Sequence, residues 1–318
     1  MVNFLITGAN GFIGKSLCTE LARQGHSVRA AGRTANSLIE GVEVVALGSI
    51  DGETDWTRAL RDVEVVIHLA ARAHVLRENA EHPLQEFRTV NVAGTEHLAR
   101  CAATSGVRRL VYISSIGVHG LHTEPGTVFS ETSGINPHNA YTLSKWEAEQ
   151  SLSRLSAETG LGVVVVRPPL VYGAGVPGNF ALMLDALAKR MPLPFASIHN
   201  QRSLIYVGNL IDALIACAIH PYAVGQTYLV SDGEDISTPD LLRRLGTAMG
   251  IPARLLPCPA ALLKFAGRMT GKTEQIERLL SSLQVDSDKM RRDLNWRPPY
   301  SLQQGLQDTA DWYTNTHP

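Results

Sequence analysis

The stretch Val2-Asn-Phe-Leu-Ile-Thr-Gly-Ala-Asn-Gly-Phe-Ile-Gly14 decides the expected fold. A short apolar run, predicted to be a strand over residues 3–6, leads directly into glycines at positions 8, 11 and 14, and a helical pattern follows. In such a turn the first glycine permits a tight bend, the second lets a pyrophosphate approach the backbone, and the third allows close helix–strand packing. The helix N-terminus then offers oriented N–H groups to a phosphate. Their place between a strand and a helix favours dinucleotide binding over a chance spacing of glycines.

The first half of the chain alternates short β-rich runs with helical patterns, as βαβ units do. Strands are expected over residues 3–6, 27–31, 42–46, 65–69, 109–114 and 162–167, and helices over 14–24, 55–61, 86–105 and 141–159. Several strands are continuously apolar, which is typical of a parallel sheet covered on both faces. We therefore expect an α/β fold with a Rossmann-type doubly wound parallel sheet.

The second half is less regular. A helix over 180–189, a strand over 203–207, a helix over 208–219 and a strand over 226–231 precede a helical tail rich in proline and arginine. We expect a dinucleotide-binding domain over 1–167, with 203–230 returning to it. Residues 168–202 and 231–318 would form a smaller C-terminal substrate-binding lobe.

Composition excludes several classes of protein. The 318 residues are 44% hydrophobic and 19% charged, with a net charge of −1, which argues against a disordered chain and a basic nucleic-acid surface. No apolar run approaches the roughly 20 residues that span a bilayer. The four cysteines lie far apart and no histidine pair has metal-ligand spacing, so we expect neither disulfides nor a metal site. The N-terminus has no signal-peptide pattern, and we expect a cytoplasmic protein.

The cofactor prediction depends on the residues after the second strand. NAD-binding forms carry an acidic residue there, which accepts hydrogen bonds from the ribose 2′-hydroxyl. Here the sequence runs Ala31-Gly32-Arg33-Thr34 with no carboxylate. An arginine at this place pairs with the 2′-phosphate of NADP, so we favour NADP. The alternative is a solvated Arg33 with NAD held by other contacts.

The pair Tyr141-x-x-x-Lys145 carries the predicted chemistry, together with Ser115 at the end of the fifth strand. A four-residue spacing puts both side chains on one helix face. The ammonium would lower the pKa of the phenol, so that Tyr141 moves a proton to or from a substrate oxygen held by Ser115. The alternative is a tyrosine packed on the sheet beside a surface lysine.

These residues together resemble the extended short-chain dehydrogenase/reductases, in particular the nucleotide-sugar epimerase, dehydratase and reductase group. The resemblance covers nearly the whole chain, through 7–14, 65–71 (Val-Val-Ile-His-Leu-Ala-Ala), Asn91, 112–120, 141–145, 167–173 and 202–207 (Arg-Ser-Leu-Ile-Tyr-Val). It implies that the cofactor contacts Gly8, Gly11, Phe12, Ile13, Gly14, Arg33, Ser49, Ile50, Leu69, Ala70, Ala71, Tyr141, Lys145 and Pro168.

The same resemblance implies a UDP-sugar substrate. Arg202 would clamp the pyrophosphate, Asn179 would add a second diphosphate contact, and Pro194 with Phe195 would pack on the nucleotide base. An ordinary surface ion pair for Arg202, and structural roles for Asn179 and Phe195, are the alternatives. His74 is a further candidate for the sugar pocket. Such enzymes are often homodimers through the helices over 86–105 and 141–159.

One departure from the group separates the possible reactions. The 4,6-dehydratases carry an Asp-Glu pair directly after the Ser/Thr position, where this chain has Ile116-Gly117. Neither residue transfers a proton, so hydride exchange at the sugar C4 alone is expected. We favour a 4-keto-reductase acting on a UDP-4-keto-6-deoxy-N-acetylhexosamine in surface-polysaccharide synthesis, with a UDP-hexose 4-epimerase retaining NAD as the alternative. A redox-sensing regulator and a reductase of non-sugar ketones are more distant alternatives.

Overall fold

The computed structural model describes residues 1–34, 41–73, 82–271 and 273–317, and the side chain of Glu274 lies outside this description. Within these residues seven strands form one parallel sheet in the order β3-β2-β1-β4-β5-β6-β9. The strands are β1 (Asn3–Thr7), β2 (Ser27–Gly32), β3 (Glu43–Ala46), β4 (Val65–His68), β5 (Arg109–Ile113), β6 (Gly162–Arg167) and β9 (Thr227–Leu229). The six strands predicted for the first half are all confirmed.

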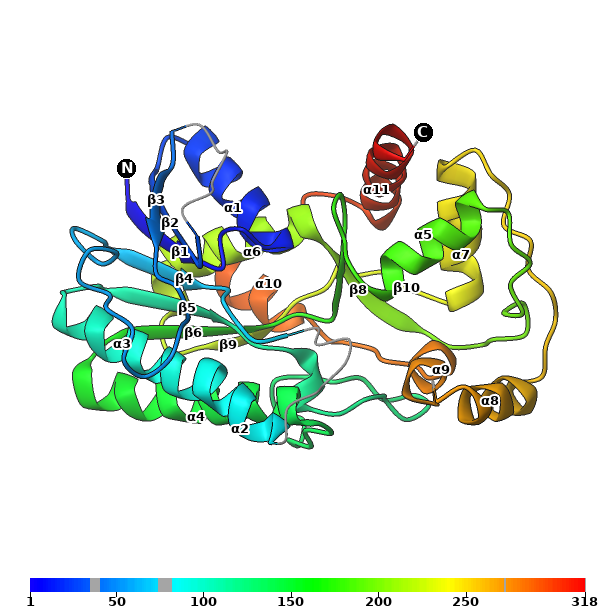
Figure 1. Cartoon of the computed structure of the whole chain (residues 1–318), viewed down its shortest axis with the longest axis horizontal. Helices are drawn as coiled ribbons and strands as arrows, with labels where there is room; N and C mark the ends of the chain where they lie inside the picture. The colour runs from blue at the N-terminus through cyan, green and yellow to red at the C-terminus, as the bar shows by residue number, and fades with distance from the viewer. Residues whose placement is uncertain (35–40, 74–81, 272, 318) are drawn as a thin grey trace.

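Helices cover both faces of this sheet (Figure 1). On one face, α1 (Phe12–Arg23) and α6 (Val207–Ile219) pack on Phe4 and Ile6 of β1. On the other face, α3 (Gly94–Thr104) and α4 (Ala140–Thr159) share a core with Leu5 of the same strand. This alternation is what a strand buried on both faces requires. The sheet is therefore doubly wound, as expected.

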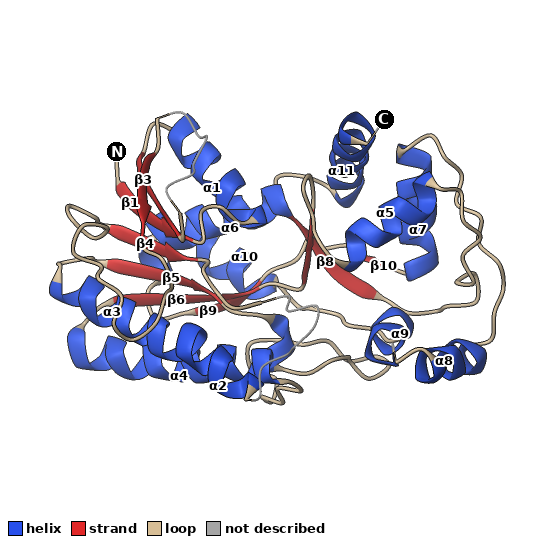
Figure 2. Cartoon of the chain, in the orientation of Figure 1, coloured by secondary structure: helices blue, strands red, loops and turns tan. Residues whose placement is uncertain are grey.

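A second sheet of three strands, β10-β8-β7, lies beside the large one (Figure 2). Its strands are β7 (Leu170–Tyr172), β8 (Arg202–Tyr206) and β10 (Asp235–Ile236), and around them lie α5 (Asn179–Ala188), α7 (Thr238–Ala248) and α11 (Leu302–Thr316). Phe180, Leu204, Leu242 and Leu306 are fully buried in the core between these elements. The remaining helices are α2 (Pro83–Arg88), α8 (Ala260–Met269), α9 (Thr273–Leu280) and α10 (Asp288–Leu294). The domain limits stay a prediction.

The helix predicted over 55–61 is wrong. Trp56 and Leu60 are buried as an amphipathic helix would place them, but the segment forms turns. The Asp55 carboxylate accepts a hydrogen bond from the Thr57 amide at 2.9 Å, and Asp62 adopts φ +58°. Side-chain-to-backbone bonds of this kind compete with helix formation in so short a segment.

Candidate active site

The strand order reverses between β1 and β4, and ligands of doubly wound sheets bind at this point beyond the carboxyl ends of the strands. Thr7 ends β1 and His68 ends β4. The Thr7 Oγ1 lies 2.6 Å from His68 Nδ1 and accepts a hydrogen bond from the Ala70 amide at 3.1 Å. The other ring nitrogen of His68 lies 2.9 Å from Thr95 Oγ1. Burial lowers the pKa of His68 to about 3, so this neutral ring acts as a structural bridge across the reversal point.

The glycine loop, residues 8–14, follows β1 and packs next to this bridge. Gly8 has φ +68°, and a Cβ there would stand 2.8 Å from the Ala70 amide nitrogen. A Cβ on Gly14 would stand 2.3 Å from the Gly8 carbonyl oxygen. Helix α1 begins after Gly11 without a side-chain cap, so no side chain covers the N–H groups at Phe12 and Ile13. Uncapped N–H groups at a helix N-terminus, beside glycines that admit no side chain, fit the pyrophosphate of a dinucleotide.

The residues predicted at the adenosine end lie in two neighbouring loops. Arg33 is exposed, directly after β2, where a Cβ on Gly32 would meet the Asn10 side chain of the glycine loop. Ser49 is also exposed. Ile50 is half-buried, and a Cβ on Gly94 at the start of α3 would stand only 2.8 Å from its Cγ2.

Sequence reasoning missed Asp51 in this loop. Its carboxylate accepts hydrogen bonds from the Glu53 amide at 2.9 Å and from Thr54 Oγ1 at 3.2 Å. An aspartate side chain often accepts a hydrogen bond from the amide two residues later, in an Asx turn. The Asp51-x-Glu53 spacing could therefore have pointed to this turn. The role that follows from these contacts is to fix the loop that carries Ser49 and Ile50.

Ser115 and the start of α4 are brought together by close packing. Ser115 follows β5 and caps a short 3₁₀ turn over Ile116–Val118, its Oγ accepting a hydrogen bond from the Gly117 amide at 3.1 Å. A Cβ on Gly117 would stand 2.7 Å from Thr142 Cγ2 and 3.3 Å from Ser115 Oγ. At Gly117, the second of the two positions that are acidic in dehydratases, an added side chain would therefore collide with Thr142.

Helix α4 begins at a fixed residue because Asn139 caps it. The Asn139 side chain accepts a hydrogen bond from the Thr142 amide, and the Thr142 hydroxyl accepts one from the Asn139 amide, which together form a capping box. Tyr141 thus lies in the first turn, with its ring edge-on to Phe87 at 6.2 Å between centroids. Its hydroxyl has no hydrogen-bond partner among the described residues, and it is available to a substrate oxygen.

The electrostatics of the pair differ from the sequence expectation. Lys145 is 2% exposed, and its Nζ lies 4.1 Å from the centroid of the Tyr112 ring. Burial lowers the pKa of Lys145 to about 7, against the opposing effect of Glu149. Burial also raises the pKa of Tyr141 to about 12, where the sequence argument expects Lys145 to lower it. The reason is that desolvation disfavours both charged forms, so at neutral pH the phenol carries its proton.

A buried ion pair behind Lys145 was also missed. Glu149 lies one helical turn further along α4 and forms two hydrogen bonds with the guanidinium of Arg167, at the end of β6. Both side chains are about 5% exposed or less. Arg167 also lies 2.9 Å from His119 Nε2. The i, i+4 spacing of Lys145 and Glu149 places both side chains on one helix face and could have drawn attention to Glu149. The sequence does not show that Arg167, on β6, is its partner.

The Asn91 side chain forms hydrogen bonds both to the loop after β4 and to α4, the helix that carries Tyr141 and Lys145. It lies in a π-helical turn (Thr89–Ala93) between α2 and α3, inside the helix predicted over 86–105. Its Oδ1 accepts a hydrogen bond from the Arg72 amide at 2.8 Å, and its Nδ2 donates one to Ser144 Oγ at 2.9 Å. Such turns often occur at functional sites. Asn91 therefore holds the segment after Leu69, Ala70 and Ala71 against α4.

Pro168 is buried at the end of β6, and its carbonyl accepts a hydrogen bond from the Ile116 amide at 3.0 Å. It therefore lies beside the Ser115 turn.

The predicted substrate residues lie further away, in the smaller lobe. Asn179 is the exposed first residue of α5, and Pro194 and Phe195 are half-buried in the following loop.

Arg202 is the first residue of β8. Its Nη1 donates hydrogen bonds to the carbonyls of Arg278 at 2.6 Å and Ser281 at 3.2 Å. Burial and the neighbouring Arg278 lower the pKa of Arg202 to about 10, so it remains cationic at neutral pH. The surface ion pair offered as the alternative for Arg202 is absent among the described residues. His74 lies outside the described residues.

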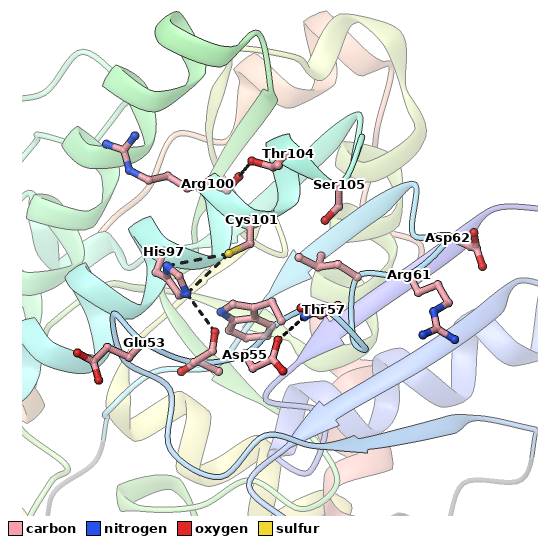
Figure 3. A pocket seen from close by; sticks show the side chains of 13 residues that line it. Glu53, Asp55, Thr57, Arg61, Asp62, His97, Arg100, Cys101, Thr104 and Ser105 are labelled. Atoms are coloured by element: carbon pink, nitrogen blue, oxygen red, sulfur yellow. Dashed lines mark hydrogen bonds between the residues drawn. The ribbon is translucent and has the colours of Figure 1, made fainter.

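A pocket of about 820 Å³ lies elsewhere, between residues 53–62 and the outer face of α3. Figure 3 shows His97 and Cys101 facing one another in it, with Cys101 Sγ 3.7 Å from His97 Nε2. Its lining contains none of the predicted site residues.

No group of three metal-ligating side chains occurs in the described part of the chain. No helix among these residues is long and apolar enough to cross a membrane.

Comparison with known proteins agrees with this fold. A model of the NAD dependent epimerase/dehydratase family matches residues 4–231. A UDP-glucose 4-epimerase of Vibrio cholerae is 41% identical over 310 residues, which are 97% of this chain and 94% of that protein. An N-acetyl-alpha-D-glucosaminyl-diphospho-ditrans,octacis-undecaprenol 4-epimerase of Escherichia coli O157:H7 is 25% identical over 325 residues, 98% and 95% of the two chains. The structure of MoeE5 in complex with UDP-glucose and NAD gives a TM-score of 0.80 at 22% identity, over 99% of both chains.

These matches define an enzyme of the extended short-chain dehydrogenase/reductase class, on the Rossmann-type fold predicted from the sequence. Within this class the chain belongs to the NAD-dependent epimerase/dehydratase family.

Proposed function

We propose that this protein is a UDP-hexose 4-epimerase, which inverts the C4 hydroxyl of a UDP-sugar and retains its nicotinamide cofactor between the two half-reactions. The observation that carries the proposal is the 41% identity to the Vibrio cholerae UDP-glucose 4-epimerase over 97% of the chain. The close packing at Gly117 argues against a dehydratase, because a side chain at the second position of the dehydratase acid–base pair would collide with Thr142.

In the proposed mechanism a bound nicotinamide would supply the hydride exchange at C4, and the residues of this chain would position the sugar and move the proton. In the first half-reaction Tyr141 would have to act as the phenolate to receive the proton of the C4 hydroxyl, and in the second it would give that proton back. Binding of the positively charged oxidised nicotinamide beside it would have to lower its pKa from the high value of the empty site. Ser115 donates a hydrogen bond to the same oxygen, and the buried Lys145 stabilises the phenolate whenever Tyr141 is deprotonated. The backbone at Gly8, Gly11 and Gly14 would hold the pyrophosphate of the cofactor, and Pro168 would flank the nicotinamide.

On the substrate side, Arg202 would clamp the UDP diphosphate. Its Nη1 is already used by two backbone carbonyls, so the Nε and Nη2 edge of the guanidinium would face the phosphate oxygens. Asn179 would add a hydrogen bond from the start of α5, and Pro194 with Phe195 would pack on the uracil ring. We also propose a homodimer through α3 and α4. The half-buried Val92, in the π-helical turn before α3, and Trp146 of α4 line a common surface pocket there.

The second candidate is the 4-keto-reductase favoured by the sequence alone, and Arg33 is the observation in its favour. Arg33 is exposed beside the glycine loop, as a 2′-phosphate partner would be. A reductase releases its cofactor in every cycle, whereas an epimerase retains it. The cofactor assignment therefore follows the reaction: NAD for the epimerase and NADP for the reductase.

Cofactor retention offers a test that needs no substrate. The purified protein is denatured, and the released dinucleotide is identified by mass spectrometry. The epimerase account predicts close to one NAD for each chain after gel filtration. A protein that loses its dinucleotide on gel filtration and rebinds NADPH more tightly than NADH would instead support the reductase.

A further inference from the structure

Helix α8 exposes most of its apolar side chains. Of its ten residues only Leu263 and Gly267 are buried. Leu262 is 59%, Phe265 63% and Met269 73% exposed. A surface helix normally turns such residues toward a core, so this arrangement calls for a partner outside the described chain.

The exposed residues form an ordered face. At 3.6 residues per turn, Leu262, Phe265 and Met269 lie within an arc of about 60° on one side of the helix. The exposed Lys264 and Arg268 lie on one side of this apolar stripe around the helix, and the buried Leu263 lies on the other side. A helix with an apolar stripe bordered by cations is typical of segments that lie in the interface of a lipid bilayer.

The positive charge around α8 also favours an anionic lipid surface. Residues 251–272 contain four lysines and arginines and no aspartate or glutamate, in a chain whose net charge is −1. Among the side chains that the structure describes, Lys264, Arg268 and Arg254 form no ion pair, although neighbouring α9 carries an exposed Glu277. The local positive charge is therefore available to an anionic surface.

We propose that α8 docks this protein onto the surface of an anionic phospholipid bilayer. Leu262, Phe265 and Met269 enter the boundary between headgroups and acyl chains, and Lys264 with Arg268 contacts lipid phosphates. A second copy of the chain fits this face less well, because pairing two α8 helices brings their cations together. Three apolar side chains also bury much less than the 1,200 Å² or so that a stable protein interface needs.

The docked helix is tied to the predicted substrate end of the site. The segment before α8 is hydrogen-bonded to the loop that carries Pro194 and Phe195: Leu193 N donates to Arg254 O, and Leu256 N to Leu193 O, both at 2.8 Å. Figure 1 places α8 at the outer edge of the smaller lobe, away from β1–β3. Docking would therefore hold the smaller lobe against the bilayer and leave the large sheet in solvent.

Vesicle co-sedimentation of the full-length protein tests the proposal independently of the enzymatic activity. The vesicles contain phosphatidylcholine with phosphatidylglycerol in equal parts, or phosphatidylcholine alone, at low and high salt. We expect binding to the anionic vesicles only, weakened by salt. A Leu262→Ser, Phe265→Ser, Met269→Gln variant should lose more than tenfold in affinity. Lys264→Gln and Arg268→Gln should each lose about fivefold.

The matched control replaces exposed apolar residues of the other lobe, Ile219→Ser with Tyr222→Ser, which are 47% and 74% exposed. This control should bind like the wild type. The proposal is overturned if the wild type ignores anionic vesicles, or if the α8 triple variant binds them unchanged. It is also overturned if the triple substitution only converts a dimer to a monomer in gel filtration, which would assign the face to a second copy of the chain.

Discussion

The Lys145 ammonium lies 4.1 Å from the centroid of the Tyr112 ring, and both side chains are almost fully buried between α4 and the sheet. The negative face of an aromatic ring is a weak substitute for water around a cation. The pKa of Lys145 is accordingly lowered to about 7. The residue that the proposed mechanism needs as a cation is thus poised to lose its proton near neutral pH.

This position predicts a pH-dependent stability. An unfolded lysine titrates near 10.5 and the folded one near 7, so between these values the unfolded state binds more protons and stability rises with pH. Below pH 7 the cost of the buried charge is fully present. We expect Lys145→Met to raise the free energy of unfolding at pH 6, by up to about 5 kcal/mol, and to change it little at pH 10.5. Urea denaturation of both proteins across this range measures the difference, and a constant difference would contradict the account.

Tyr141→Phe should separate chemistry from folding. The Tyr141 hydroxyl has no hydrogen-bond partner among the described residues, so its removal leaves the melting temperature nearly unchanged. Turnover should fall by 10²–10⁴, the usual contribution of a general acid–base group. Steady-state kinetics and thermal melting of the same preparation provide the comparison. Turnover above a tenth of the wild-type value would remove Tyr141 from the mechanism.

Glu149→Gln should destabilise the protein and move its pH profile. It leaves the buried Arg167 without its anionic partner, which costs about 3–5 kcal/mol. It also removes the charge that opposes the lowering of the Lys145 pKa, so the limb of the pH–rate profile that reports Lys145 moves further below 7.

The matched control for this variant is Glu147→Gln on the same helix. Glu147 pairs with Arg88 at 2.5 Å, and the side chains of Arg88 and Glu147 are 43% and 26% exposed, far more than those of Glu149 and Arg167. Such pairs contribute about 0–1 kcal/mol, so the control should keep both its stability and its pH profile. Equal losses in the two variants would show that the burial of the Glu149–Arg167 pair has no special role.

Gly14→Ala should abolish dinucleotide binding. Its Cβ would stand 2.3 Å from a backbone oxygen of the glycine loop, so the helix must move away from the strand. The control is Gly134→Ala, where a Cβ meets no atom within 4 Å. The NAD retained after gel filtration, released by denaturation and measured by mass spectrometry, is expected at the wild-type level in the control and to be absent from Gly14→Ala. Undiminished NAD binding by Gly14→Ala would mean that the cofactor lies elsewhere.

The sequence predicted the parts of the site that are local. The glycine spacing, the strand–turn–helix order and the Tyr141–Lys145 spacing are short-range patterns, and the fold follows from them. The contacts that the sequence did not predict join distant segments. Asn91 reaches the Arg72 backbone and Ser144, and Arg167 closes on Glu149 from another strand.

The predicted effect of Lys145 on Tyr141 was wrong for a related reason. The spacing put both residues on one helix face but carried no information about the depth of burial. Burial raises the pKa of Tyr141 to about 12. Likewise, the helix predicted over 55–61 is wrong because the Asp55 turn determines the backbone conformation there.

The central claim is epimerisation at C4 without net redox change. We would incubate the purified protein, without added cofactor, with UDP-glucose or UDP-galactose, and with the two N-acetyl forms, and follow the anomeric proton resonances by NMR. The account predicts that one of these pairs reaches the same ratio from both directions, at constant absorbance at the nicotinamide band. No interconversion, together with stoichiometric NADPH consumption on a UDP-4-keto-6-deoxy-N-acetylhexosamine, would contradict it.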